Sequence, residues 1–138
     1  MKALIALVYL VVSLSGPSAD VSTKGINFFE GNFREALAAA KKEKKPVFIY
    51  LHATWCGQCK KLKKSFKDEA AGEYFNKNFI NISVDGETEE GAMLRSLYNV
   101  KEYPTLLIVD ANSKLQTKTT GYHTPYLLMN FGKRIVPN

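Results

Sequence analysis

Hydrophobic positions first recur at helical spacing in the segment that follows Asn32. The repeat runs through Phe33, Ala36, Leu37 and Ala40. Asn32 and Glu35 have the spacing of a capping box at its start. The pattern therefore predicts an amphipathic helix that extends to about Lys44 and is ended by Pro46.

A strand, a helix and a second strand are predicted next. The continuous apolar run at residues 47–51 is typical of a central strand that is covered on both faces. A helix is expected from Gly57, because one side of its helical wheel collects the apolar residues Cys59, Leu62 and Phe66. Gly72 is expected to loosen this helix, and residues 79–85 alternate as a second strand.

The C-terminal half reads as a helix, a hairpin and a last helix. The helices are predicted over residues 88–98 and 124–134, and the hairpin pairs residues 105–109, opened by Pro104, with residues 114–120. The order of elements predicts an α/β fold with a central mixed β-sheet and helices on both faces.

The first residues have the layout of a secretory signal peptide. Met1-Lys2 is a basic start, residues 3–14 are an apolar run and residues 15–19 supply small residues and a proline. The apolar run would reach only about 18 Å, which is short of a ~30 Å hydrocarbon core. We expect a signal peptide over residues 1–19, a domain over residues 20–138 and no stable membrane anchor after cleavage.

Composition and charge narrow the classes of partner. A chain of 138 residues that is 46% hydrophobic can form one domain with its own core, and we expect a monomer. The net charge is +6, but acidic residues interrupt the lysines and no base-reading motif accompanies them, so nucleic-acid binding is not expected. The lysines at residues 60–67 are either a solvated helix face or a basic rim that favours acidic partners.

The chain contains two cysteines, Cys56 and Cys59. A disulfide between them would close a very short loop. By restricting the unfolded chain it would stabilise the fold by only about 2 kcal/mol, against ~3 kcal/mol for a fifteen-residue loop. A pair so poorly placed as a staple, in a chain predicted to be exported, favours redox chemistry.

The predicted elements assign different roles to the two thiols. Cys56 lies where a strand ends and a helix begins, so free backbone N–H groups and the helix dipole can stabilise its thiolate. Cys59 lies about one turn later and can resolve the mixed disulfide that Cys56 forms with a substrate.

A zinc site is the alternative use of such a pair. His52 and His123 could complete a Cys₂His₂ set, but their spacing matches no zinc-finger pattern. We expect no metal and no cofactor beyond the Cys56-Cys59 disulfide itself.

The segment ATWCGQCK at residues 53–60, together with Tyr103-Pro104-Thr105, resembles the thioredoxin superfamily, above all its exported thiol:disulfide interchange proteins. The likeness covers roughly residues 26–134. It implies a thioredoxin-like fold in which Pro104 is cis and faces the cysteines. It further implies a substrate groove bordered by Trp55, Gly57, Gln58, Tyr103, Pro104 and Gly121. Trp55 could otherwise be core filler, and His52 a satisfied strand-end histidine.

The sequence departs from thioredoxin itself at three positions. Gln58 replaces the usual proline, Tyr50 stands where a buried aspartate is usual, and Asn81 takes the place of its lysine partner. A general base for Cys59 is therefore unassigned, with Tyr50, water and Glu87 as candidates.

The resemblance implies an enzyme, a thiol:disulfide oxidoreductase that exchanges disulfides with protein substrates outside the cytoplasm. We expect a reductase, fed by an upstream membrane or soluble electron donor, in a bacterial periplasm rather than secreted. A disulfide isomerase or oxidase is the first alternative, and a non-catalytic binding module is the second.

Overall fold

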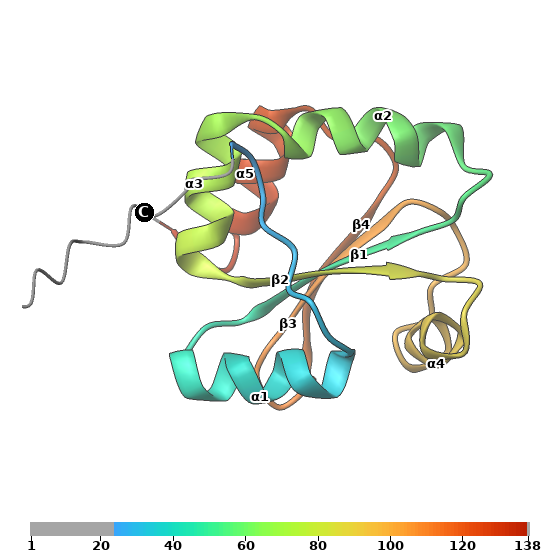
Figure 1. Ribbon diagram of the computed structural model, residues 1–138, viewed down its shortest axis with the longest axis horizontal. Helices are drawn as coiled ribbons and strands as arrows, with labels where there is room; N and C mark the ends of the chain where they lie inside the picture. The colour runs from blue at the N-terminus through green and yellow to red at the C-terminus, as the bar shows by residue number, and fades with distance from the viewer. Residues whose placement is uncertain (1–23, 138) are drawn as a thin grey trace, which may run out of the picture.

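The computed structural model describes residues 24–137, which form one four-stranded sheet with helices on both faces (Figure 1). The predicted signal peptide at residues 1–19 lies outside the described residues. The elements in chain order are α1 (Phe33–Glu43), β1 (Val47–His52), α2 (Gly57–Phe66), α3 (Glu69–Asn78), β2 (Ile80–Asp85), α4 (Glu89–Leu97), β3 (Thr105–Val109), β4 (Leu115–Thr120) and α5 (Pro125–Lys133).

The sheet is mixed, with the strand order β2-β1-β3-β4. Strand β1 runs parallel to β2 and antiparallel to β3, and β3 pairs antiparallel with β4. The parallel pair is connected through α2 and α3, and β3 and β4 form the predicted hairpin. The predicted fold class is confirmed.

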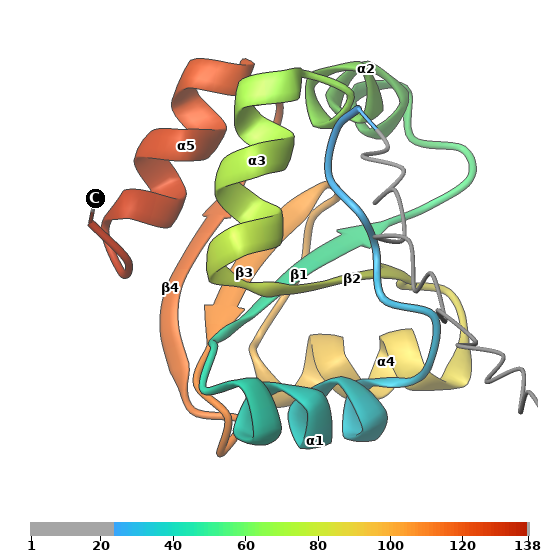
Figure 2. The same ribbon diagram turned by 60° about the vertical axis from the view of Figure 1, so that its left-hand side comes forward.

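Alternate residues of β1 face the two helical layers. Phe48 and Tyr50 belong to a buried cluster that also holds residues of α2, α3 and α5. Val47, Ile49 and Leu51 pack in a second cluster with residues of α1 and α4. Figure 2 shows α1 and α4 on one side of the sheet and the other three helices on the opposite side. The segment that follows β1 leads into α2, on the same side of the sheet as Phe48 and Tyr50.

The structure corrects the expectation of one helix that Gly72 loosens. Helix α2 ends at Phe66, and Asp68 starts the separate helix α3 by accepting a hydrogen bond from the Ala71 N–H at 2.9 Å. Gly72 lies within α3, where a Cβ atom would overlap the backbone of Gly25. The glycine is needed for this close approach and does not break the helix.

Candidate functional site

Cys56 and Cys59 form a disulfide at the start of α2, with 5.2 Å between their Cα atoms. Cys56 follows β1 after a short turn and is the N-cap residue of the helix. Both residues are buried, at 6% and 3% exposure. The sequence prediction of a cysteine pair between a buried strand and a helix is confirmed.

The backbone of α2 favours negative charge on Cys56. The Cys59 N–H donates a hydrogen bond to the Cys56 sulfur at 3.1 Å. No acidic residue lies in the first turn of α2, so the positive end of the helix dipole is not opposed there. This donor and the helix dipole stabilise the Cys56 thiolate, which is the reactive form of a thiol.

Tyr50 lies beneath the second cysteine. Its hydroxyl donates a hydrogen bond to the Cys59 carbonyl oxygen at 3.1 Å, and its side chain is 1% exposed. Burial raises the pKa of Tyr50 to about 12. The hydroxyl is thus protonated near neutral pH and acts as a donor, which argues against Tyr50 as the general base for Cys59.

His52 stacks on the Tyr50 ring, with 4.9 Å between the ring centroids. Asp85 lies opposite it in the parallel register of β1 and β2. Burial lowers the pKa of His52 below its usual 6.5, Asp85 acts against this shift and Lys63 adds to it. His52 is therefore a half-buried imidazole that is harder to protonate than an exposed one. The sequence offered it either as a strand-end histidine or as a zinc ligand.

The aromatic side of the site is formed by Trp55 and Tyr103. Their rings meet edge to face with centroids 5.7 Å apart, and Trp55 is 70% exposed. The alternative of Trp55 as core filler is therefore wrong. The peptide bond between Tyr103 and Pro104 is cis, as the resemblance implied.

Gly86 supports Tyr103 from below, a contact that sequence reasoning missed. Gly86 is buried, and a Cβ atom there would overlap the Tyr103 ring. The two residues lie on different loops, so no local sequence signal indicates their contact. Burial raises the pKa of Tyr103, and Glu87, a candidate base for Cys59, lies near enough to add to this shift.

Gly121 lies between Pro104 and the first turn of α2. It has φ +87° and donates its N–H to the Pro104 carbonyl at 2.9 Å. A Cβ atom on Gly121 would lie 3.7 Å from the Gln58 side-chain oxygen. Gly57, next to Gln58, is exposed and has open space around it. These contacts join Gly121 to Pro104 on one side and bring it close to Gln58 on the other.

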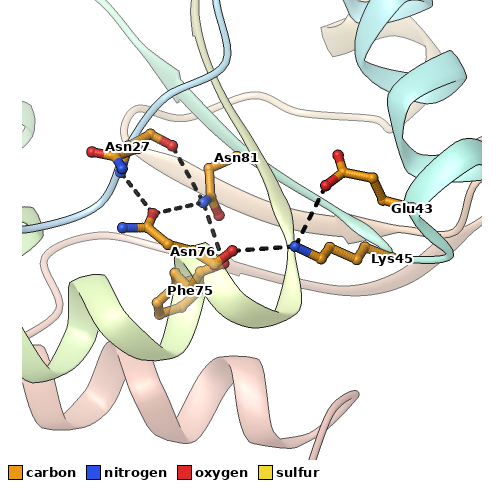
Figure 3. A network of polar contacts seen from close by, with 6 residues as sticks. All are labelled: Asn27, Glu43, Lys45, Phe75, Asn76 and Asn81. Atoms are coloured by element: carbon orange, nitrogen blue, oxygen red, sulfur yellow. Dashed lines mark hydrogen bonds and ion pairs between the residues drawn. The ribbon is translucent and has the colours of Figure 1, made fainter. Parts of the chain in front are cut away.

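The side-chain nitrogen of Asn81 makes its hydrogen bonds to the N-terminal segment and to α3, not to the cysteine pair. Figure 3 shows its side-chain nitrogen directed at Asn27 and at the end of α3. It lies 3.3 Å from the Phe75 carbonyl and 3.4 Å from the Asn76 side-chain oxygen. Lys45 continues the network by donating to the Asn76 carbonyl at 3.4 Å. The position that holds a lysine in thioredoxin here joins the N-terminal segment to α3.

Neither a metal-holding cluster nor a membrane-spanning helix is found within the described part of the chain. No group of three or more His, Cys, Asp or Glu side chains in residues 24–137 is arranged to hold a metal ion. No helix in that range is both long and apolar enough to span a bilayer.

Comparison with known proteins matches residues 29–111 to the family model described as thioredoxin-like. A solution structure of a Bacteroides thetaiotaomicron protein, named as a candidate disulphide-isomerase, superposes with a TM-score of 0.72. The two chains are 38% identical, and the match covers 84% of this chain and 98% of the other.

Two curated relatives match over different lengths. A thioredoxin of Mycoplasma genitalium is 31% identical over 67 residues, which are 49% of this chain and 61% of the relative. The protein disulfide-isomerase erp38 of Neurospora crassa is 26% identical over 129 residues, which are 93% of this chain and 34% of the relative. The chain thus spans about a third of the isomerase and less than two thirds of the thioredoxin.

Proposed function

Because the chain belongs to the thioredoxin-like family and carries the cysteine pair of a thiol:disulfide oxidoreductase, we propose that it reduces disulfide bonds of protein substrates outside the cytoplasm. The observation that carries this proposal is Cys56 as the N-cap of α2, with the Cys59 N–H directed at its sulfur. The Gly57-Gln58 pair between the cysteines, which resembles the reducing members of the superfamily, supports the reductive direction.

The proposed reaction is two consecutive exchanges. The Cys56 thiolate attacks one sulfur of the substrate disulfide, so a mixed disulfide forms and the other substrate sulfur leaves as a thiolate that takes up a proton. The Cys59 thiol then loses its proton and attacks Cys56. The Cys56-Cys59 disulfide forms, the second substrate thiol is released, and two electrons have passed to the substrate.

The substrate is held in the groove beside the disulfide. Trp55, Gly57, Gln58, Tyr103, Pro104 and Gly121 border it in this proposal. The exposed indole of Trp55 and the open space at Gly57 support this assignment, because they leave apolar surface and room next to Cys56.

Export is part of the proposal and rests on the sequence pattern of residues 1–19. The domain at residues 20–138 would act as a monomer in a bacterial periplasm, with no cofactor beyond its own disulfide. Each turnover oxidises the pair, so an upstream electron donor, membrane-bound or soluble, must reduce it again.

The reduction potential of the Cys56-Cys59 pair tests the direction of the reaction. It is measured by equilibrating the domain with defined glutathione ratios and quantifying free thiols. We expect a value near −270 mV, which is typical of a reductase. A value above about −180 mV would overturn the reductive role.

A disulfide isomerase is the second candidate function, because the 38% identical Bacteroides protein carries that description. In an isomerase, another thiolate of the same substrate attacks the mixed disulfide, so that a new substrate disulfide forms and Cys56 leaves as a thiolate. Reactivation of a scrambled, disulfide-containing enzyme without net reduction would favour this role.

A binding module is the remaining candidate, and unchanged partner capture after both cysteines become alanine would favour it.

A further inference from the structure

One face of α2 carries a continuous group of lysines that the proposed reaction does not use. This basic face consists of Lys60, Lys61, Lys63 and Lys64 of α2 and its C-cap residue Lys67, all of them exposed. Among residues 24–137 the one ion pair joins Lys45 to Glu43. The lysines of the basic face therefore have no carboxylate partner within the described chain. They lie on the same helix that begins at the cysteine pair.

The basic face reaches the cysteines from two sides. The Lys60 N–H donates to the Cys56 carbonyl, which places Lys60 one helical turn from Cys56. The Lys61 ammonium lies 4.3 Å from the centroid of the Tyr122 ring, next to Gly121. On the other side Lys63 is near enough to His52 to disfavour its protonation.

Carboxylates also lie close to this end of the molecule, around Tyr103, and one of them, Asp85, faces His52 in the register of β1 and β2. Burial raises the pKa of Tyr103, and the charges of Glu87 and Asp85 add to this shift. The Arg95 guanidinium lies 5.8 Å from the centroid of the same ring. A uniformly anionic surface, such as a nucleic acid or an acidic membrane, would meet these carboxylates when it approached the disulfide. A protein segment can place its acidic residues on the side of α2 alone.

We propose that the basic face of α2 selects disulfides that lie beside acidic segments of protein substrates. This inference rests on the proposed function, because selection is expressed through the rate at which Cys56 attacks. Opposite charges on the two partners raise the rate of productive encounter, by 10-fold to about 10³-fold for strongly charged sites. Salt screens this attraction.

The test compares two peptide disulfides of identical design. Each peptide has one central cysteine with two glutamates on either side, or glutamines in the neutral version. The second-order rate of their reduction by the dithiol protein is measured by stopped flow. We expect the acidic peptide to react about tenfold faster at low ionic strength. The difference should fall below about twofold in 1 M NaCl, where the Debye length is about 3 Å.

Matched variants locate the effect on α2. Lys60, Lys64 and Lys67 are changed to glutamine together, since their side chains contact neither Tyr122 nor His52. The control changes Lys41 and Lys42 of α1 together with its C-cap residue Lys44, and α1 lies on the other side of the sheet (Figure 2). Both triple variants lose the same charge. The acidic-to-neutral rate ratio should fall toward one in the α2 variant and stay at the wild-type value in the control.

The ratio also separates this inference from the proposed function. Failure to reduce either peptide would refute the redox role itself. Equal rates for both peptides, or equal losses in both triple variants, would overturn selection by the basic face. Salt-sensitive binding of single-stranded DNA or phosphatidylglycerol vesicles with equal peptide rates would likewise overturn it, in favour of a nucleic acid or a membrane.

Discussion

The hydroxyl of Tyr50 donates a hydrogen bond to the backbone carbonyl of Cys59 at 3.1 Å. This bond ties the central strand to the first turn of α2, at the point where the second cysteine must be held. Where thioredoxin has a buried carboxylate, this chain has a neutral donor. Tyr50 therefore positions Cys59 without accepting its proton.

Tyr50 and Tyr74 are expected to make the fold sensitive to alkali. The pKa of each is raised to about 12 by burial, against 10 for an exposed tyrosine. Between pH 10 and 12 the unfolded chain loses these protons while the folded chain keeps them. The free energy of unfolding should therefore fall as pH rises through this range, by up to about 1.4 kcal/mol per unit for each residue.

Urea unfolding at several pH values checks this dependence. Tyr50→Phe and Tyr74→Phe should each flatten the alkaline slope, and Tyr50→Phe should cost about 1 kcal/mol at pH 7 for its lost hydrogen bond. Tyr126→Phe is the control, since that side chain is 69% exposed. A wild-type slope in both buried variants would contradict the prediction.

The two cysteines are expected to have unequal roles. Cys56→Ser removes the attacking thiolate, so reduction of insulin should fall to the uncatalysed rate. Cys59→Ser leaves the attack intact and removes the resolving thiol, so a mixed disulfide with substrate should accumulate on Cys56 and be visible by mass spectrometry. Accumulation on Cys59 in the Cys56→Ser variant instead would reverse the assigned roles.

His52 should titrate below pH 6.5, and its neighbours should shift it in opposite directions. Asp85 favours the charged imidazole, so Asp85→Asn should lower the pKa of His52 further. Lys63 disfavours it, so Lys63→Gln should raise that pKa. The ring proton resonances of His52 followed by NMR over pH give both values. A rise in the Asp85→Asn variant would contradict this account.

The sequence predicted elements whose signals are local. The capping box at Asn32 and the strand after Pro46 follow from short patterns and are confirmed. The break between α2 and α3 was missed although its signal, the N-cap Asp68, is local. The role of Gly72 could not be predicted, because it depends on contact with Gly25, far earlier in the chain.

The candidate site shows the same division. The positions of Cys56 and Cys59 follow from the sequence, because a strand-to-helix junction has a local pattern. The hydrogen bond from Tyr50 and the support of Tyr103 by Gly86 do not, since each joins residues of different elements. Only the packing of the strands and loops reveals which side chains lie under the cysteines and against Tyr103.

Gly86 is expected to control the position of Tyr103. In Gly86→Ala the added methyl group would overlap the Tyr103 ring and push it from its place beside Trp55. The rate of reduction of a protein disulfide should fall, whereas reduction of a small aromatic disulfide, which needs no extended groove, should be less affected. Equal losses for both substrates would place the damage at the cysteines instead.

Trp55 is expected to act in substrate binding and not in stability. Its indole is 70% exposed and rests edge to face on Tyr103, so Trp55→Ala should change the free energy of unfolding by no more than about 0.5 kcal/mol. A large exposed aromatic beside the reactive sulfur offers contact area to a bound chain, and its loss should raise KM for insulin about tenfold, an affinity change of about 1.4 kcal/mol. Tyr126→Ala is the matched control, because Tyr126 is equally exposed but lies on α5. If both variants raised KM alike, or if Trp55→Ala lowered stability by several kcal/mol, the assignment of Trp55 to the groove would be wrong.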